Sequence, residues 1–212
     1  MSNKFKPGPY NYCDYRCEKC DNQQICRVYK EQEERNVRHY INNKDPNDIK
    51  IILSDLKEIF EKTKSLLQED ARKYGVNLDE MPLEDEPEIN PYDFPVYCIA
   101  NEYYQKSKVL IKDVEKIGLP KSACEDFETL IWYHTLILAK TYRLISNTEN
   151  ADDEDLQQIE KQGTIAVINK GIMLSKAALK NLLNDLPDHL HTILELLQII
   201  DRLETCLRVD FL

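Results

Sequence analysis

Residues 124–145 read CEDFETLIWYHTLILAKTYRLI, and this stretch decides the fold that the sequence predicts. Apolar residues occur on almost every side of the helix that the stretch would form, which is typical of a helix that other helices surround. Ser122 and Glu125 match a capping box at the start of this helix. We therefore expect residues 124–145 to form the central helix of an all-α bundle.

Five more helices are predicted by apolar residues that recur at helical spacing on both sides of this stretch. No alternating strand pattern longer than a few residues interrupts them. A chain of 212 residues is long enough to bury a substantial core as one domain. The expected helices start near Cys26, Pro46, Val96, Asp155 and Pro187, and they end near Ile41, Tyr74, Ile117, Asp185 and Leu207.

Local signals mark the ends of the first two predicted helices. Asp21 and Gln24 resemble a capping box ahead of the first helix. Asp45 is expected to be the N-cap of the second helix, because Pro46 suits the first helical position. Gly75 is expected to end the second helix as a C-cap. After it, the acidic and proline-rich residues 76–95 predict an extended connection.

Two glycines, Gly163 and Gly171, lie inside the fifth predicted helix. Glycine inside a helix costs about 1 kcal/mol relative to alanine. The spacing of the pair puts both residues near one face, where the missing side chains would let a neighbouring helix approach. We therefore expect close helix packing at these positions.

Four cysteines lie close together near the N-terminus, with the spacing C-x3-C-x2-C-x5-C. In a reducing compartment such a cluster holds a metal more often than it forms disulfides. Short spacings let one loop bring several thiolates to a single metal centre. The sequence thus predicts a cysteine-rich metal-binding arm of residues 1–26, packed on a helical bundle of residues 27–212 as a single domain. The expected ligands are Cys13, Cys17, Cys20 and Cys26.

Two kinds of metal centre fit four thiolates. Zinc takes four sulfur atoms in a tetrahedron at about 2.3 Å. An iron–sulfur cluster also accepts four cysteines from a contiguous loop. The proline-free spacing, the lack of a second C-x2-C pair and the flanking tyrosines favour an iron–sulfur cluster, and zinc stays open as the alternative.

Part of this motif resembles a known iron–sulfur segment. The spacing of Cys17, Cys20 and Cys26 is similar to the C-x2-C-x5-C segment in the auxiliary domains of radical SAM peptide-modifying enzymes. Cys13 lies upstream, however, where that pattern has a downstream cysteine. The chain also lacks the strand–helix alternation of the barrel that radical SAM chemistry requires. We therefore do not assign it to that class.

A second resemblance covers the arm and the central helix. The run from Tyr12 to Cys20 is similar to a run in small uncharacterised bacterial helical proteins, which also carry a Trp-Tyr pair with a Lys and an Arg in a central helix. This resemblance implies no function. The matching residues in the central helix here are Trp132, Tyr133, Lys140 and Arg143.

His134 is a second candidate site, because it lies among apolar residues of the central helix. A buried histidine that bonds to a carbonyl or a tyrosine is the ordinary structural outcome. If His134 instead met Glu102 or Glu128 inside the bundle, the pair would form an acid–base or metal site. Whether the chain is an enzyme therefore stays open.

Lys140 and Arg143 interrupt the apolar surface of the same helix. Each must reach solvent or find an acidic partner. If they met Trp132 and His134 at a cavity, an anionic ligand would fit there. The remaining cysteines, Cys98, Cys124 and Cys206, have apolar neighbours, and we expect them to pack as small core residues.

The charge of the chain argues against two classes of partner. A net charge of −10 and a pI near 5.0 disfavour nucleic acid and anionic membrane surfaces. The first nine residues lack the apolar run of a signal peptide, and the apolar run 130–139 is too short to cross a bilayer. We expect a cytoplasmic protein with no nucleic-acid and no membrane partner.

The expected function is that of a metal-binding protein with a structural or interaction role, with another protein as its possible partner. One alternative is an iron–sulfur redox or sensor protein. The other is an enzyme with a bundle cavity around His134.

Overall fold

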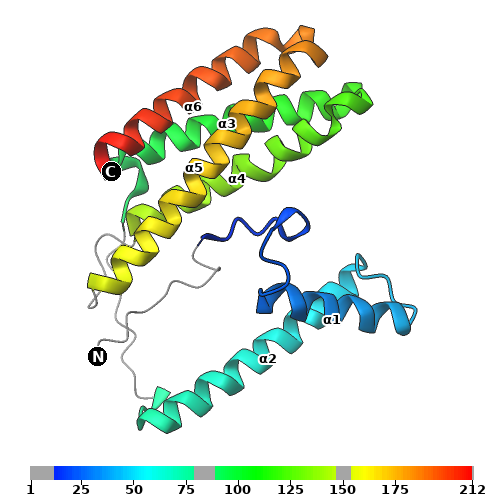
Figure 1. The fold of residues 1–212 in the computed structure, drawn as a ribbon, viewed down its shortest axis with the longest axis vertical. Coiled ribbons are helices and arrows are strands. Elements are labelled where there is room, and N and C mark those ends of the chain that lie inside the picture. The colour runs from blue at the N-terminus through cyan, green and yellow to red at the C-terminus, as the bar shows by residue number, and fades with distance from the viewer. Residues whose placement is uncertain (1–11, 79–88, 147–153, 212) are drawn as a thin grey trace. The chain divides into compact units, whose positions relative to one another are not determined.

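A computed structural model describes residues 12–78, 89–146 and 154–211, without the side chains of residues 154–156. These residues form six α-helices, and no strand occurs among them (Figure 1). The all-α prediction and the number of main helices are therefore confirmed. The predicted connection over residues 76–95 lies largely outside the described residues.

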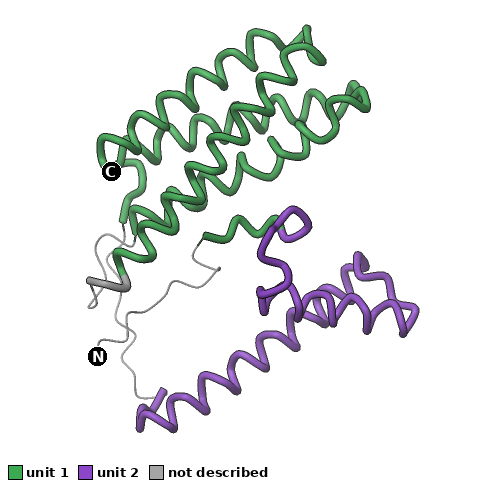
Figure 2. Tube along the Cα trace, in the orientation of Figure 1, with its two compact units in different colours: residues 1–16, 89–212 green, residues 17–88 purple. Residues whose placement is uncertain are grey.

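The chain divides into two compact units (Figure 2). The first unit comprises residues 1–16 and 89–212, and the second comprises residues 17–88. The division falls between Arg16 and Cys17, inside the cysteine motif, whereas the sequence predicted a boundary after residue 26.

The first unit is built from four helices. They are α3 (Pro95–Ile117), α4 (Cys124–Ser146), α5 (Glu154–Asp185) and α6 (Leu190–Phe211). Helix α4 packs against α3 and α5, and α6 packs against the same two helices. Their apolar faces meet in one core, whose largest fully buried side chains include Tyr103, Leu110, Leu130, Tyr133, Leu179 and Leu196.

Helix α4 is one of the four bundle helices and does not lie at the centre, so that expectation was wrong. Leu130, Tyr133 and Ile137 face the core, but Tyr142 stays 46 % exposed and Trp132 36 % exposed. The physical reason is that two helical neighbours cover only part of a helix. The apolar residues on the outward side of α4 therefore do not indicate burial by further helices.

Gly171 lets α5 approach α4 closely, as the sequence predicted. A Cβ atom on Gly171 would lie 3.0 Å from Tyr133 Cδ1 and 3.0 Å from Ile137 Cγ1. These distances are shorter than normal contacts, so only glycine fits without movement of the core. Gly163 is also buried.

The turns of the first unit agree only in part with the capping signals. Gly118 ends α3 with a φ of 81°, as expected of a residue in this role. Ser122, in contrast, does not cap α4. It lies in the 3-10 turn Lys121–Ala123, and its hydroxyl donates to Asp185 Oδ1 at 2.9 Å.

The second unit contains α1 (Arg27–Ile41) and α2 (Ile49–Tyr74). Cys26 is the N-cap of α1, so the Asp21–Gln24 capping box is not formed. Asp48 caps α2 by accepting the main-chain N–H of Lys50 at 2.9 Å, three residues later than predicted. The carboxylate of Asp45 accepts the N–H of Asn47 in the preceding turn instead. At the other end of α2, Gly75 forms the predicted left-handed C-cap.

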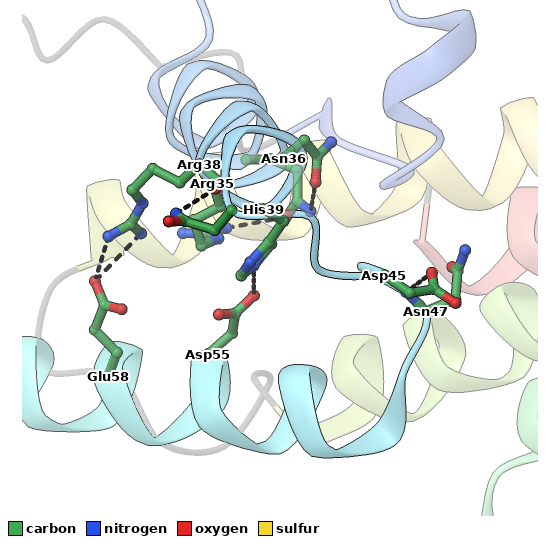
Figure 3. Close-up of polar contacts among 10 residues, drawn as sticks. Arg35, Asn36, Arg38, His39, Asp45, Asn47, Asp55 and Glu58 are labelled. Atoms are coloured by element: carbon green, nitrogen blue, oxygen red, sulfur yellow. Dashed lines mark hydrogen bonds and ion pairs between the residues drawn. The ribbon is translucent and has the colours of Figure 1, made fainter.

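Polar contacts connect α1 with α2 (Figure 3). His39 Nε2 lies 2.8 Å from Asp55 Oδ2, and the Arg38 guanidinium lies 3.3 Å from Glu58 Oε1. Helix α2 buries none of its residues. The second unit is therefore joined mainly by polar contacts, with little apolar core of its own.

Candidate functional site

The candidate site is the short segment Cys13–Arg16, which packs on helices of the first unit. Asp14 is only 4 % exposed and Arg16 only 6 % exposed, although both carry a charge. Burial of a charged group is costly unless hydrogen bonds and an opposite charge compensate it. The partners of these two residues therefore define the site.

Asp14 is held by three donors from α4 and α5. Its Oδ2 atom accepts a hydrogen bond from the Tyr133 hydroxyl at 2.6 Å and pairs with Lys170 Nζ at 2.7 Å. Its main-chain carbonyl accepts the indole N–H of Trp132 at 2.9 Å. Both the side chain and the main chain of Asp14 are thus fixed to the bundle.

The electrostatics at Asp14 favour the carboxylate. Burial alone would raise the pKa of Asp14. Hydrogen bonds from Lys170 and Tyr133, together with the charge of Lys170, outweigh burial and lower the pKa below its ordinary value. Asp14 is therefore ionised when the segment is in place.

Arg16 and Tyr15 add contacts on either side. Arg16 Nη1 donates to the hydroxyl of Thr129 at 2.9 Å. The ring of Tyr15 lies 5.1 Å from Lys140 Nζ, within the range of a cation–π interaction. Tyr15 has a φ of 60°, which few non-glycine residues adopt, and the contacts on both sides hold it there.

Burial also affects Lys140 itself. It lowers the pKa of the Lys140 ammonium, and the nearby charge of Arg143 acts in the same direction. The charges of Cys13 and Asp14 act in the opposite direction. The resemblance to the bacterial proteins named Trp132, Tyr133, Lys140 and Arg143. The first three contact residues 13–16, and Arg143 pairs with Glu160 instead.

Three sulfur atoms of the cysteine motif accept hydrogen bonds from the main chain. The donor–acceptor distances are 3.3 Å from Tyr15 N to Cys13 Sγ, 3.4 Å from Asn22 N to Cys20 Sγ and 3.5 Å from Tyr29 N to Cys26 Sγ.

The structure does not assemble these cysteines into a metal centre. All seven cysteines lie in the described residues, and no disulfide joins them. Across residues 12–78, 89–146 and 154–211, no group of three or more His, Cys, Asp or Glu side chains is placed to hold a metal ion. Cys13 belongs to the first unit, and Cys17, Cys20 and Cys26 belong to the second. The four-cysteine site stays a prediction.

His134 has the environment of an ordinary buried histidine. Its Nδ1 atom lies 2.6 Å from the carbonyl oxygen of Ile131, and its ring stacks on Tyr104 with a centroid distance of 5.5 Å. Burial lowers the pKa of His134 below its ordinary value. This histidine is therefore neutral near pH 7.

The other residues of the predicted pocket do not meet His134. Glu102 pairs with Arg202 at 3.1 Å, and Arg143 pairs with Glu160 at 3.4 Å. Glu128 is exposed. Trp132 and Lys140, as described above, contact residues 13–16 instead. These six residues are therefore distributed over several separate contacts.

The three cysteines outside the motif differ from the expected core residues. Cys98 and Cys124 are exposed, because each lies on an outward face of its helix, whereas Val96 and Phe127 in the same turns face the core. Cys206 is partly buried and lies 3.2 Å from Asp210 Oδ2. Burial, together with this carboxylate, raises the pKa of the Cys206 thiol to about 11, so it is protonated at neutral pH.

Sequence reasoning missed Asp14 and Lys170 as site residues. Asp14 carries one signal, a charged residue between two cysteines of a tight motif. Lys170 carries none, because the turn of α5 that brings it to Asp14 depends on the close approach at Gly171.

Comparisons with family models, with curated proteins and with solved structures show no match to this chain. None of the helices in the described part of the chain combines the length and the apolar character that a membrane span needs.

Proposed function

We propose that this protein binds a metal centre through Cys13, Cys17, Cys20 and Cys26, and that the centre has a structural or interaction role. The spacing C-x3-C-x2-C-x5-C supports this, because one short loop can bring all four sulfur atoms to a common centre. The observation that carries the proposal is the set of main-chain N–H groups that point at three of these sulfur atoms.

These N–H groups support metal binding for an electrostatic reason. A thiolate bound to a metal keeps negative charge, and an N–H donor stabilises that charge without competing for the metal. Cys26 gains a further contribution, because it caps α1 and lies at the positive end of the helix dipole.

The attachment of Asp14 and Arg16 gives further support. These residues fix the main chain next to Cys13 to helices α4 and α5. A ligand held by its neighbours loses less conformational freedom when it binds. Of the two centres that fit four thiolates, an iron–sulfur cluster is our first choice and zinc the second.

Metal analysis of protein purified without oxygen tests the proposal. We expect iron with inorganic sulfide, or zinc, in a constant ratio to protein, and an iron–sulfur cluster would also give a brown colour. The Cys17→Ser variant should lose the metal. The Cys98→Ser variant is the matched control, because Cys98 is exposed and outside the motif, and it should keep the metal. Protein that stays without metal after reconstitution with either centre would refute the proposal.

A redox or sensor role is the second candidate function. The hydrogen bonds to sulfur favour it, since such bonds tune the potential of an iron–sulfur cluster. A cluster whose visible absorption bleaches and returns over cycles of reduction and oxidation would support this role. Protein that holds only zinc would exclude it.

A further inference from the structure

Helix α2 carries an apolar stripe that is closely spaced from Ile49 to Phe60 and continues with Leu67 and Tyr74 beyond the polar residues Thr63 and Asp70. Six apolar residues follow one another at intervals of three, four or seven residues along the helix. This spacing is typical of the face by which one helix packs against another. Phe60 is 69 % exposed and Leu53 is 58 % exposed. We call this set the α2 stripe, and its members are Ile49, Leu53, Leu56, Phe60, Leu67 and Tyr74.

Helix α1 does not cover the α2 stripe. Its contacts with α2 involve Asp55, Glu58 and Lys62, which lie to one side of the stripe (Figure 3 shows the first two). Between the two helices runs a groove of about 930 Å³ that includes Ile59 and Leu66. These two residues border the stripe, so the apolar surface continues from the stripe to this edge of the groove, whose other lining residues are mostly charged.

Lysines line the other edge of the stripe. Lys50, Lys57 and Lys64 follow one another at intervals of seven residues, so all three lie along the same flank of α2. Lys57 lies 3.9 Å from Glu61 in an exposed pair. Within the described residues, Lys50 and Lys64 form no ion pair. At Lys50 and Lys64 the flank thus presents positive charge that no ion pair among the described residues neutralises.

We propose that the α2 stripe is a docking site for an amphipathic helix of another protein that carries Asp or Glu beside its apolar face. Large exposed apolar patches mark interaction sites, and a helix that lies in a helical groove is a common mode of recognition. Acidic residues on the partner would meet Lys50, Lys57 and Lys64 while its apolar side chains cover the stripe.

The lysine flank also argues against a second copy of the chain as the occupant. In an antiparallel pair of α2 helices, this flank of one copy would face the same flank of the other, and like charges would repel. In a parallel pair, the lysines would face the row of Ile52, Ile59 and Leu66. Neither arrangement places acidic side chains next to Lys50, Lys57 and Lys64.

Two synthetic helical peptides as long as α2 test the proposal with the full chain. Both carry leucine at the seam positions. One peptide carries glutamate on both sides of its leucine seam, and the other carries lysine at the same positions. By fluorescence anisotropy at low salt, we expect the acidic peptide to bind about tenfold more tightly, since three exposed ion pairs together account for such a factor. Added salt should reduce the difference.

Variants of α2 separate the two parts of the surface. Phe60→Glu should abolish binding of the acidic peptide, because it places a charge inside the stripe. Lys57→Glu combined with Lys64→Glu should reverse the preference, so that the basic peptide binds more tightly. Lys180→Glu on α5 is the matched control and should change neither affinity.

Three outcomes would overturn the proposal. Equal affinity for the two peptides would show that the charge of the peptide does not determine which one binds. Dimers of the chain in sedimentation that Phe60→Glu dissociates would assign the stripe to a second copy. Failure of both peptides to bind, with a loss of stability in Phe60→Glu, would show that the chain covers its own stripe.

Discussion

The Tyr133 hydroxyl donates a 2.6 Å hydrogen bond to the carboxylate of Asp14, and so joins the core of the first unit to the cysteine-bearing segment. Tyr133 is 1 % exposed, so its hydroxyl cannot exchange this partner for bulk water. The carboxylate in turn needs the donor, because a buried charge without hydrogen bonds is unstable. The position of residues 13–16 therefore depends on the packing of α4.

Replacement of Tyr133 by Phe removes this donor and keeps the ring. We expect the free energy of unfolding to fall by about 1.5–3 kcal/mol, the range for a hydrogen bond to a charged group. Urea denaturation followed by circular dichroism measures it. Tyr103→Phe is the matched control, because the buried Tyr103 hydroxyl lies beside the neutral hydroxyls of Ser107 and Ser175 and bonds to no charged group. That variant should change stability by less than about 1 kcal/mol. Equal losses in both would contradict the role of Tyr133.

Replacement of Asp14 by Asn should release the segment from the bundle. The neutral amide loses the ion pair with Lys170, so residues 13–16 should detach more often. Trp132 is the only tryptophan of the chain and donates to the Asp14 carbonyl, so its fluorescence emission should shift to longer wavelength. Trypsin should also cut faster after Arg16, which is buried in the wild type.

The exposed Asp21 supplies the control for this experiment. Asp21→Asn removes the same charge from the same part of the sequence and should leave both the emission and the cleavage rate unchanged. Unchanged emission and cleavage in Asp14→Asn would mean that the ion pair with Lys170 does not hold the segment.

Replacement of Gly171 by Ala should destabilise the first unit. The new Cβ atom would lie 3.0 Å from atoms of Tyr133 and Ile137, and the hydrogen bond to Asp14 hinders movement of the Tyr133 ring. Overpacking costs about 1–3 kcal/mol and outweighs the helix propensity of alanine, which contributes about 1 kcal/mol. Thermal unfolding measures the net loss.

A second substitution tests the steric reason. Ile137→Val in the Gly171→Ala background makes room for the new methyl group, so the double variant should lose less stability than the two single changes add up to. Strict additivity would show that Ile137 is not the obstacle.

The pH dependence of stability should reflect His134. Its pKa in the folded protein is lowered by burial, so the unfolded chain binds the proton more readily. The stability that neutral His134 contributes is therefore complete above the unfolded pKa of about 6.5 and is lost as the pH falls towards the folded pKa. We expect His134→Gln to flatten this decline between about pH 7.5 and pH 5.5 in urea denaturation.

His191 is exposed and supplies the control. The His191→Gln variant, measured over the same pH range, shows what the loss of an exposed imidazole does. If His134→Gln and the wild type lost the same stability on acidification, the decline would have to come from other groups.

Apolar periodicity was enough to predict six helices, and glycine and proline signals predicted most of their ends. Gly75 and Gly118 end helices as expected, since few other residues adopt their positive φ angles. The N-terminal caps were harder to predict, because Asp45 and Asp48 are chemically equal candidates and only the path of the turn selects Asp48. The sequence did not predict that the outward side of α4 is exposed. Periodicity shows where apolar residues lie on a helix, but it does not show how many other helices pack against that helix.

The amino-acid sequence determined the helices, the four-cysteine spacing and the close packing at Gly171, because each of these depends on residue type and local spacing. Tertiary structure decided that Asp14 is buried between Tyr133 and Lys170, and that α1 leaves the apolar stripe of α2 uncovered. The physical reason is that a salt bridge or an uncovered surface depends on which helices meet. Residues far apart in the chain carry no local sign of such a meeting.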